Sequence, residues 1–166
     1  MSLFPRPLLQ LAELVLGDAR DKSLKIVTAE SCTGGLVAGC LTEVAGSSSV
    51  VERGFVTYSN EAKRDMLGVP GDMIADHGAV SEPVARAMAE GALEDSRGHV
   101  SVSITGIAGP GGGSKMKPVG LVHMAAARLR FSMIHEVYRF GDVGRDEVRM
   151  QAVQAALELL RRQIDR

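Results

Sequence analysis

The segment Thr28-Ala29-Glu30-Ser31-Cys32-Thr33-Gly34-Gly35 constrains the fold of this 166-residue chain more than any other. It follows a mostly apolar run at residues 24–27 and precedes a helical pattern at residues 36–44, so the sequence predicts a strand, a turn and a helix. Ser31 lies at the turn, and the two glycines allow the backbone to approach a bound group closely. The first amides of the helix have no partners within it and carry its positive dipole end.

A hydroxyl beside free amides is the arrangement that acyl transfer requires, because it places a nucleophile next to an oxyanion hole. Ser31 or Thr33 would equally serve as an ordinary N-cap of the helix, which is a common role for these residue types. The segment alone leaves both interpretations open.

Composition indicates an ordinary globular protein. The length fits one domain, residues 1–166, with a sizeable core. A net charge of −1, with no strong basic or acidic block, argues against a nonspecific binder of nucleic acid or of membrane surfaces. Charged residues from Asp18 to Lys22 soon follow the first apolar segment, so we expect neither a signal peptide nor a membrane span.

The only two cysteines are Cys32 and Cys40. If both lie on or beside one helix, eight residues separate them by roughly 12 Å, which is too far for a disulfide. So few cysteines fit a reducing cytoplasm, which is the location we expect.

Hydrophobic periodicity and turn residues predict alternating helices and strands. We expect helices at residues 7–20, 34–44, 60–67, 70–76, 81–96 and 145–164, with Asn60 as a helix cap. Strands are expected at residues 25–28, 50–58, 100–105, 119–127 and 131–140, the last two forming a hairpin around 128–130. This order predicts an α/β fold, a single layered α/β/α domain with a mixed β-sheet.

Ligand sites in such sheets collect at the carboxyl ends of strands. Ser31, Tyr58 and the pair Thr105-Gly106 each follow or end an expected strand. We therefore expect these residues to share one site, which favours a role for Ser31 beyond that of an N-cap.

Lys63 is the best candidate for the base that a catalytic serine needs. It lies in the first turn of a helix that starts at a strand end, and burial can lower the pKa of a lysine enough for it to accept a proton. Tyr58 could orient this lysine or bind substrate. The alternative for Lys63 is an ordinary solvated lysine on the surface, which is the usual environment of this residue type. The four histidines fall in no strand-end motif, and no spacing resembles a metal-binding set, so we expect no metal and no cofactor.

Five of the nine residues at 106–114 are glycine, and such a loop can direct its amides toward a phosphate or carboxylate. It matches neither the Walker loop nor the dinucleotide-binding pattern. Lys115, Lys117 and Arg145 could supply positive charge to the same anion. The alternative is a flexible connection between two strands.

Five segments, in order along nearly the whole chain, closely resemble the CinA C-terminal domain family, the nicotinamide-nucleotide amidohydrolases. They are residues 28–35 (TAESCTGG), 54–63 (GFVTYSNEAK), 77–82 (HGAVSE), 105–110 (TGIAGP) and 117–120 (KPVG). The resemblance implies hydrolysis of nicotinamide mononucleotide to nicotinic acid mononucleotide and ammonia, in pyridine-nucleotide recycling.

Family roles transfer where the motifs match. The resemblance makes Ser31 the nucleophile, Lys63 the general base and Tyr58 the aromatic residue of the site. It also places Thr105 and the loop that begins at Gly106 in the same pocket. Together with the free amides after Ser31 and the charge of Arg145, this leads us to expect oxyanion or substrate binding by Cys32, Thr33, Gly34, Gly35, Thr105, Gly106, Gly109 and Arg145. The stretch from Phe140 to Arg145 has an extra residue before the arginine compared with the family pattern, which weakens the phosphate-binding role of Arg145.

Two alternatives remain open. The chain could be a nucleotide-binding or interaction module without catalysis, a role that the competence and damage association of the CinA name suggests. Alternatively, Cys32 could be the nucleophile, since a helix N-terminus can depress a thiol pKa. In either case we expect a small-molecule partner, no nucleic acid, no membrane and a homo-oligomer, the usual state of soluble assemblies.

Overall fold

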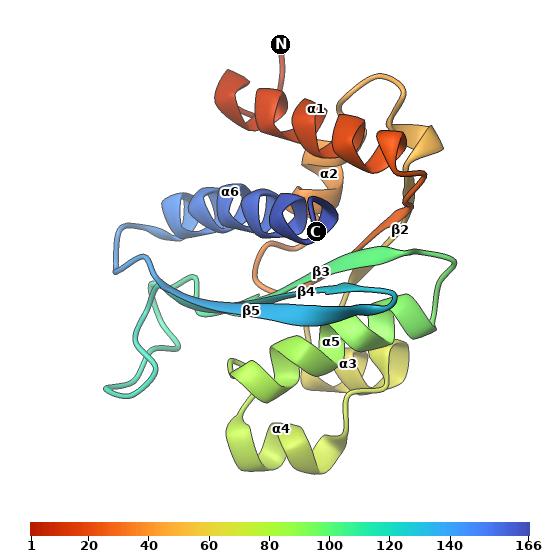
Figure 1. The fold of residues 1–166 in the computed structure, drawn as a ribbon. Helices are drawn as coiled ribbons and strands as arrows, with labels where there is room; N and C mark the ends of the chain where they lie inside the picture. The colour runs from red at the N-terminus through yellow and green to blue at the C-terminus, as the bar shows by residue number, and fades with distance from the viewer.

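The computed structural model describes residues 1–166, in which helices and strands alternate along the chain (Figure 1). The helices are α1 (Arg6–Asp21), α2 (Leu36–Thr42), α3 (Asn60–Leu67), α4 (Gly71–His77), α5 (Glu82–Glu94) and α6 (Arg145–Ile164), with a short 3₁₀ helix at Ser47–Ser49. The strands are β1 (Ile26–Glu30), β2 (Val51–Val56), β3 (Val100–Gly106), β4 (Leu121–Arg128) and β5 (Phe131–Arg139). The predicted elements are therefore all present, including the β4–β5 hairpin.

The five strands form one sheet in the order β2-β1-β3-β4-β5. β1 pairs in parallel with both β2 and β3, whereas β3–β4 and β4–β5 are antiparallel. The predicted mixed sheet is confirmed. Because β1, β2 and β3 run in the same direction, their carboxyl ends meet at one edge of the sheet.

Helices cover both faces of the sheet (Figure 1). α1, α2 and α6 pack on one face, where Ile26, Val102 and Met124 contribute to the larger apolar core. α3, α4 and α5 cover the other face, where Val27 and Ala29 pack against residues of these helices. Alternate residues of β1 therefore face opposite layers, as the two-residue period of a strand requires.

Two boundaries differ from the prediction around the functional segment. β1 continues to Glu30 instead of ending at residue 28, and α2 begins at Leu36 instead of residue 34. Gly34 and Gly35 have φ values of 57° and 101°, a left-handed conformation that glycine adopts without a steric penalty and that a helix cannot contain. Ser31 is therefore followed by a turn and not directly by a helix.

The cap of α3 is also different from the prediction. Asn60 is the first helical residue, and the preceding Ser59 is the N-cap, with its hydroxyl accepting a hydrogen bond from the amide of Ala62 at 3.0 Å. Gly54 on β2 allows this strand to pack closely against β1, because a Cβ there would lie 2.8 Å from Oγ1 of Thr28.

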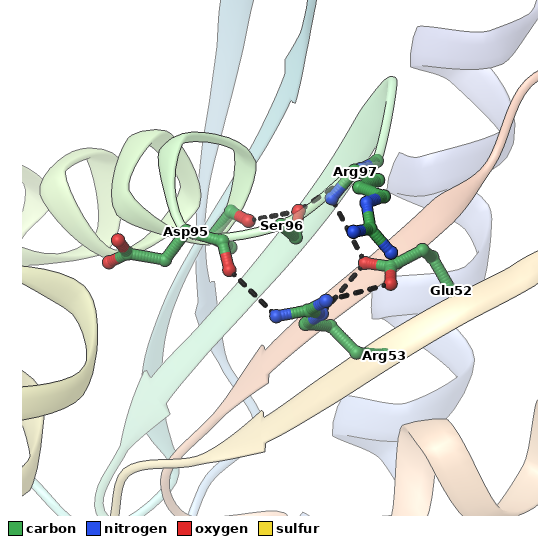
Figure 2. A network of polar contacts seen from close by, with 7 residues as sticks. Glu52, Arg53, Asp95, Ser96 and Arg97 are labelled. Carbon is green, nitrogen blue, oxygen red and sulfur yellow. Dashed lines mark hydrogen bonds and ion pairs between the residues drawn. The ribbon is translucent and has the colours of Figure 1, made fainter.

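A polar network ties β2 to the loop between α5 and β3 near the amino-terminal ends of the parallel strands (Figure 2). Arg53 forms a bidentate contact with Glu52 at 2.8 and 3.0 Å and donates to the carbonyl of Asp95. Glu52 also accepts from the amide of Arg97. The network is mostly exposed and lies at the opposite end of the strands from Ser31, so it contributes to the scaffold and not to the site.

None of the α-helices combines the length and the apolar composition that a membrane span requires.

Candidate active site

A cavity of about 270 Å³ opens where the carboxyl ends of β1, β2 and β3 meet. Eight of the predicted site residues line it together: Ser31, Cys32, Tyr58, Lys63, Thr105, Gly106, Gly109 and Arg145. Residues that the sequence analysis did not assign also line it: Asn60, Ala79, Val80, Ile107, Ala108, Gly111 and Gly112. The segment containing Ala79 and Val80 was part of the family resemblance, which was the available signal for them.

Ser31 and Lys63 form the centre of the cavity. Nζ of Lys63 lies 3.0 Å from Oγ of Ser31, although 32 residues separate them in the chain. Ser31 continues the alternation of β1 onto the face that α3 covers, and Lys63 reaches it from the first turn of α3. The Lys63 side chain is 1% exposed, which excludes the interpretation of a solvated surface lysine.

The surroundings of Lys63 make its charged form less favourable than that of a solvated lysine. Its other hydrogen bonds go to the backbone carbonyls of Thr57 at 2.9 Å and Tyr58 at 3.2 Å, and it forms no ion pair with a carboxylate. Burial lowers the pKa of the Lys63 ammonium below its usual value of about 10.5, because the charged form loses hydration that no acidic group replaces. The amine is therefore suited to accept a proton.

Tyr58 contributes to the site through two different groups. Its carbonyl holds Lys63, whereas its ring hydroxyl accepts a hydrogen bond from Arg145 at 3.0 Å. Arg145, the first residue of α6, also donates to the carbonyl of Gly109 at 2.8 Å. The extra residue before Arg145 therefore does not remove the guanidinium from the cavity wall.

Glu30 binds the first amides of α2, which the sequence analysis expected to be free beside Ser31. Its buried carboxylate accepts from the amides of Val37 at 2.9 Å and Ala38 at 3.0 Å, and from the hydroxyl of Thr33 at 2.6 Å. The expectation that the first amides of α2 face the reaction was therefore wrong, because the carboxylate already satisfies them. Gly34 and Gly35 lie outside the cavity lining and shape the turn behind it, and the Thr33 side chain, which is bound to Glu30, does not line the cavity either.

Free amides remain immediately after Ser31. The backbone N–H groups of Cys32 and Thr33 donate to no other protein group, whereas the amide of Ser31 bonds to the carbonyl of Ile104. Such unpaired donors beside a nucleophile can bind an oxyanion.

The thiol of Cys32 is a poor candidate for the nucleophile. Burial raises the pKa of the Cys32 thiol to about 12, so it is protonated near neutral pH. Cys32 and Cys40 are both free and buried.

The glycine-rich loop (residues 106–114) forms the opposite wall of the cavity. Oγ1 of Thr105 donates to the carbonyl of Ala79 at 2.9 Å, so the end of β3 is tied to the α4–α5 connection. Lys115 and Lys117 do not line the cavity, contrary to the expectation that they serve the same anion. Lys117 instead donates to the carbonyl of His77 at the end of α4, and Lys115 lines a separate cavity on the far side of the loop.

The histidines also lie outside the cavity lining. His123 and His135 occupy β4 and β5, with Nδ1 of His123 lying 3.0 Å from Nε2 of His135. Nδ1 of His135 lies 3.6 Å from the carboxylate of Glu82. Burial lowers the pKa of both imidazoles. No group of three or more His, Cys, Asp or Glu side chains is arranged to hold a metal ion.

Sequence comparison assigns the family. The model of the CinA C-terminal domain matches residues 8–164, and the chain belongs to the CinA C-terminal domain family. It is 53% identical over 154 residues to the nicotinamide-nucleotide amidohydrolase PncC of Escherichia coli K12, which covers 92% of each protein. It is also 49% identical to a putative competence-damage inducible protein of Caldicellulosiruptor bescii, but it spans only 37% of the length of that protein.

Solved structures share the fold over the whole chain. The competence/damage inducible protein CihA from Agrobacterium tumefaciens has a TM-score of 0.97 at 53% identity, with 100% of both chains covered. A CinA superfamily protein from Klebsiella pneumoniae has a TM-score of 0.90 at 33% identity, covering 95% of this chain and 98% of that one. The predicted family and fold class are confirmed.

Proposed function

We propose that this chain hydrolyses the carboxamide of nicotinamide mononucleotide to nicotinic acid mononucleotide and ammonia. The observation that carries the proposal is the buried contact of 3.0 Å between Nζ of Lys63 and Oγ of Ser31, at a cavity of about 270 Å³. Similarity to a protein named nicotinamide-nucleotide amidohydrolase over 92% of its length supports the choice of substrate.

The hydrogen bonds of Lys63 support its role as the base. A neutral amine has two N–H donors and one lone pair, whereas the ammonium has three donors and no acceptor. Nζ has three oxygen neighbours, the carbonyls of Thr57 and Tyr58 and the hydroxyl of Ser31. In the neutral state that we assign to Lys63, the two N–H groups bind the carbonyls, and the lone pair accepts the proton of the Ser31 hydroxyl. Burial favours this neutral state.

The reaction proceeds through an acyl-enzyme. Lys63 takes the proton of Ser31 as Oγ attacks the carboxamide carbon, and the carbonyl π-bond becomes an oxyanion. The oxyanion collapses, the C–N bond breaks, and Lys63 returns the proton to the departing amine to form ammonia. Water then attacks the ester and gives one proton to Lys63, which passes it to Oγ of Ser31 as the ester bond breaks. The second proton of the water leaves the resulting acid for solvent, which gives the product carboxylate.

Backbone amides and the substrate itself assist this step. We assign the free N–H groups of Cys32 and Thr33 to the oxyanion, where preorganised donors are worth several kcal/mol, on the order of 10²–10³ in rate per donor. The positive pyridinium ring withdraws electrons from the carboxamide, so the carbonyl carbon is already electrophilic. We assign the nucleotide phosphate to Arg145 and the glycine-rich loop, which line the same cavity.

We place residues 1–166 in one amidohydrolase domain that acts in pyridine-nucleotide recycling in the cytoplasm. We also propose that it works as a homo-oligomer. β5 is an edge strand with exposed Phe131 and Val137, and exposed apolar edges favour pairing with another chain. Light scattering of the purified protein would measure its mass, and a monomer at working concentration would contradict this part of the proposal.

The test of the proposed activity is ammonia release from nicotinamide mononucleotide by the wild-type protein and by Ser31→Ala. We expect stoichiometric ammonia and nicotinic acid mononucleotide from the wild type and a loss of turnover in the variant. The opposite result would be tight binding of the mononucleotide by calorimetry without turnover. It would favour the alternative of a nucleotide-binding module.

A further inference from the structure

Two charged side chains hold the turn of residues 31–35, hereafter the Ser31 turn, without lining the cavity. Glu30 contacts it from the end of β1, and Arg149 contacts it from α6. Neither residue belongs to the cavity lining, so neither is placed to touch substrate. Their contacts nevertheless involve the two residues whose amides lie next to the nucleophile.

Glu30 fixes the turn from the α2 side. The carboxylate is fully buried and binds the hydroxyl of Thr33 at 2.6 Å together with two amides of α2. Because Glu30 and Ser31 are consecutive at the end of a strand, they face opposite sides of the sheet. The negative charge therefore stays with α2 and forms no contact with Lys63.

Arg149 fixes two carbonyls of the turn. Its Nε donates to the carbonyl of Cys32 at 3.1 Å, and its Nη2 lies 3.4 Å from the carbonyl of Thr33. A trans peptide is planar, with its C=O and N–H on opposite sides. Holding the Cys32 carbonyl therefore sets the direction of the Thr33 amide, one of the two free donors.

We infer that Glu30 and Arg149 are positioning residues that together set the direction of the amides beside Ser31. Glu30 holds Thr33 by its hydroxyl, and Arg149 holds the same residue by its carbonyl, so the Thr33 backbone is restrained from two sides. The inference rests on the proposed function, because it assigns these amides to the oxyanion. It adds a role for α6, whose chain position is more than 110 residues from the turn.

Arg149→Met is the principal test, because it keeps an apolar stem and removes both donors. A misdirected amide weakens stabilisation of the transition state, and deleting an oxyanion donor costs about 10²–10³ in kcat. We expect kcat to fall at least about tenfold, KM to stay within about threefold, and the pH midpoint of kcat/KM to stay unchanged. Arg149→Lys should recover part of kcat, since an ammonium can bond one carbonyl.

Arg161→Met is the matched control. Arg161 lies on the same helix and bonds to Asp18 at 2.7 Å, remote from the Ser31 turn. The inference is overturned if Arg149→Met keeps kcat within twofold of this control, if only KM changes, or if the pH midpoint moves with the rate. Glu30→Gln should lower kcat in the same way. Should that variant fail to fold, the Arg149 series still decides the question.

A second measurement separates this inference from the proposed function. The rate at which a fluorophosphonate labels Ser31, followed by intact mass, depends on the oxyanion donors but not on the natural substrate. Labelling that slows in Arg149→Met and not in Arg161→Met supports the inference even if nicotinamide mononucleotide is not turned over. Equal labelling rates overturn it even if the mononucleotide is a substrate. If Ser31 of the wild-type protein reacts neither with the fluorophosphonate nor with nicotinamide mononucleotide, both proposals are refuted.

Discussion

Replacing Lys63 removes the only side-chain partner of the Ser31 hydroxyl, so we expect a large loss of kcat. No histidine or carboxylate lies within hydrogen-bond distance of that hydroxyl to act as a substitute base. The whole general-base contribution, typically about 10²–10⁴ in rate, should therefore be lost. We expect kcat to fall about 10³-fold, which corresponds to roughly 4 kcal/mol of transition-state stabilisation.

We expect variants of Lys63 to retain binding of the mononucleotide. The three polar contacts of Nζ are with Ser31 and two backbone carbonyls, and the side chain is 1% exposed. Lys63→Met keeps a similar length without charge, whereas Lys63→Arg keeps the charge and cannot accept a proton. Both variants should bind the mononucleotide in calorimetry and lose turnover. Lys63→Arg should also lose about 1–3 kcal/mol of stability from overpacking.

The pH profile of the wild type completes this test. The base must be neutral, so kcat/KM should rise as pH increases through the titration of the Ser31–Lys63 pair, with a midpoint below about 10.5 because burial lowers the Lys63 pKa. If Lys63→Arg keeps both its rate and this ascending limb, the lysine has an electrostatic or structural role. The base would then have to be sought elsewhere, first at Tyr58.

The remaining predictions concern two groups of the cavity and a pair of histidines outside it. Cys32→Ser should keep kcat within about threefold, since a thiol with a pKa of about 12 is not the nucleophile, and loss of ammonia release would contradict this. Tyr58→Phe should raise KM about 2- to 10-fold with little change in kcat, because it removes the hydroxyl that accepts from Arg145 and keeps the carbonyl that holds the lysine. The melting temperature should fall as pH decreases through about 6.5, because burial lowers the pKa of His123 and His135 and the unfolded chain then binds more protons. His135→Phe should flatten this dependence in a thermal scan, and an unchanged slope would assign it to other groups.

The sequence was sufficient for the architecture and for the convergence of the site. Three strand ends carry Ser31, Tyr58 and Thr105, and the parallel pairing of β1 with β2 and β3 brings them to one cavity. The periodicity of apolar residues and the turn residues predict where each strand ends, and both are local properties of the sequence. Ligands of open α/β sheets bind at the carboxyl ends of the strands, which predicts the position of the site.

The exact backbone around Ser31 could not be predicted, because long-range contacts determine it. The TAESCTGG pattern reads as an N-cap followed at once by a helix, but Glu30 takes the place of the cap and Arg149 holds the turn from the far end of the chain. Lys117 was assigned to an anion for its charge alone, whereas its nearest acceptor is a carbonyl at the end of α4. Local sequence carries no information on which distant carbonyl a long cationic side chain will reach.

The most direct test of the account is to trap the acyl-enzyme. Wild-type protein mixed with excess nicotinamide mononucleotide and quenched in acid within a few turnovers would be digested and analysed by mass spectrometry. We predict an ester of nicotinic acid mononucleotide on Ser31, formed at the same rate as the first equivalent of ammonia. Ammonia release with the adduct on Cys32, or with no adduct on Ser31 at any quench time within the first turnover, would contradict the serine mechanism.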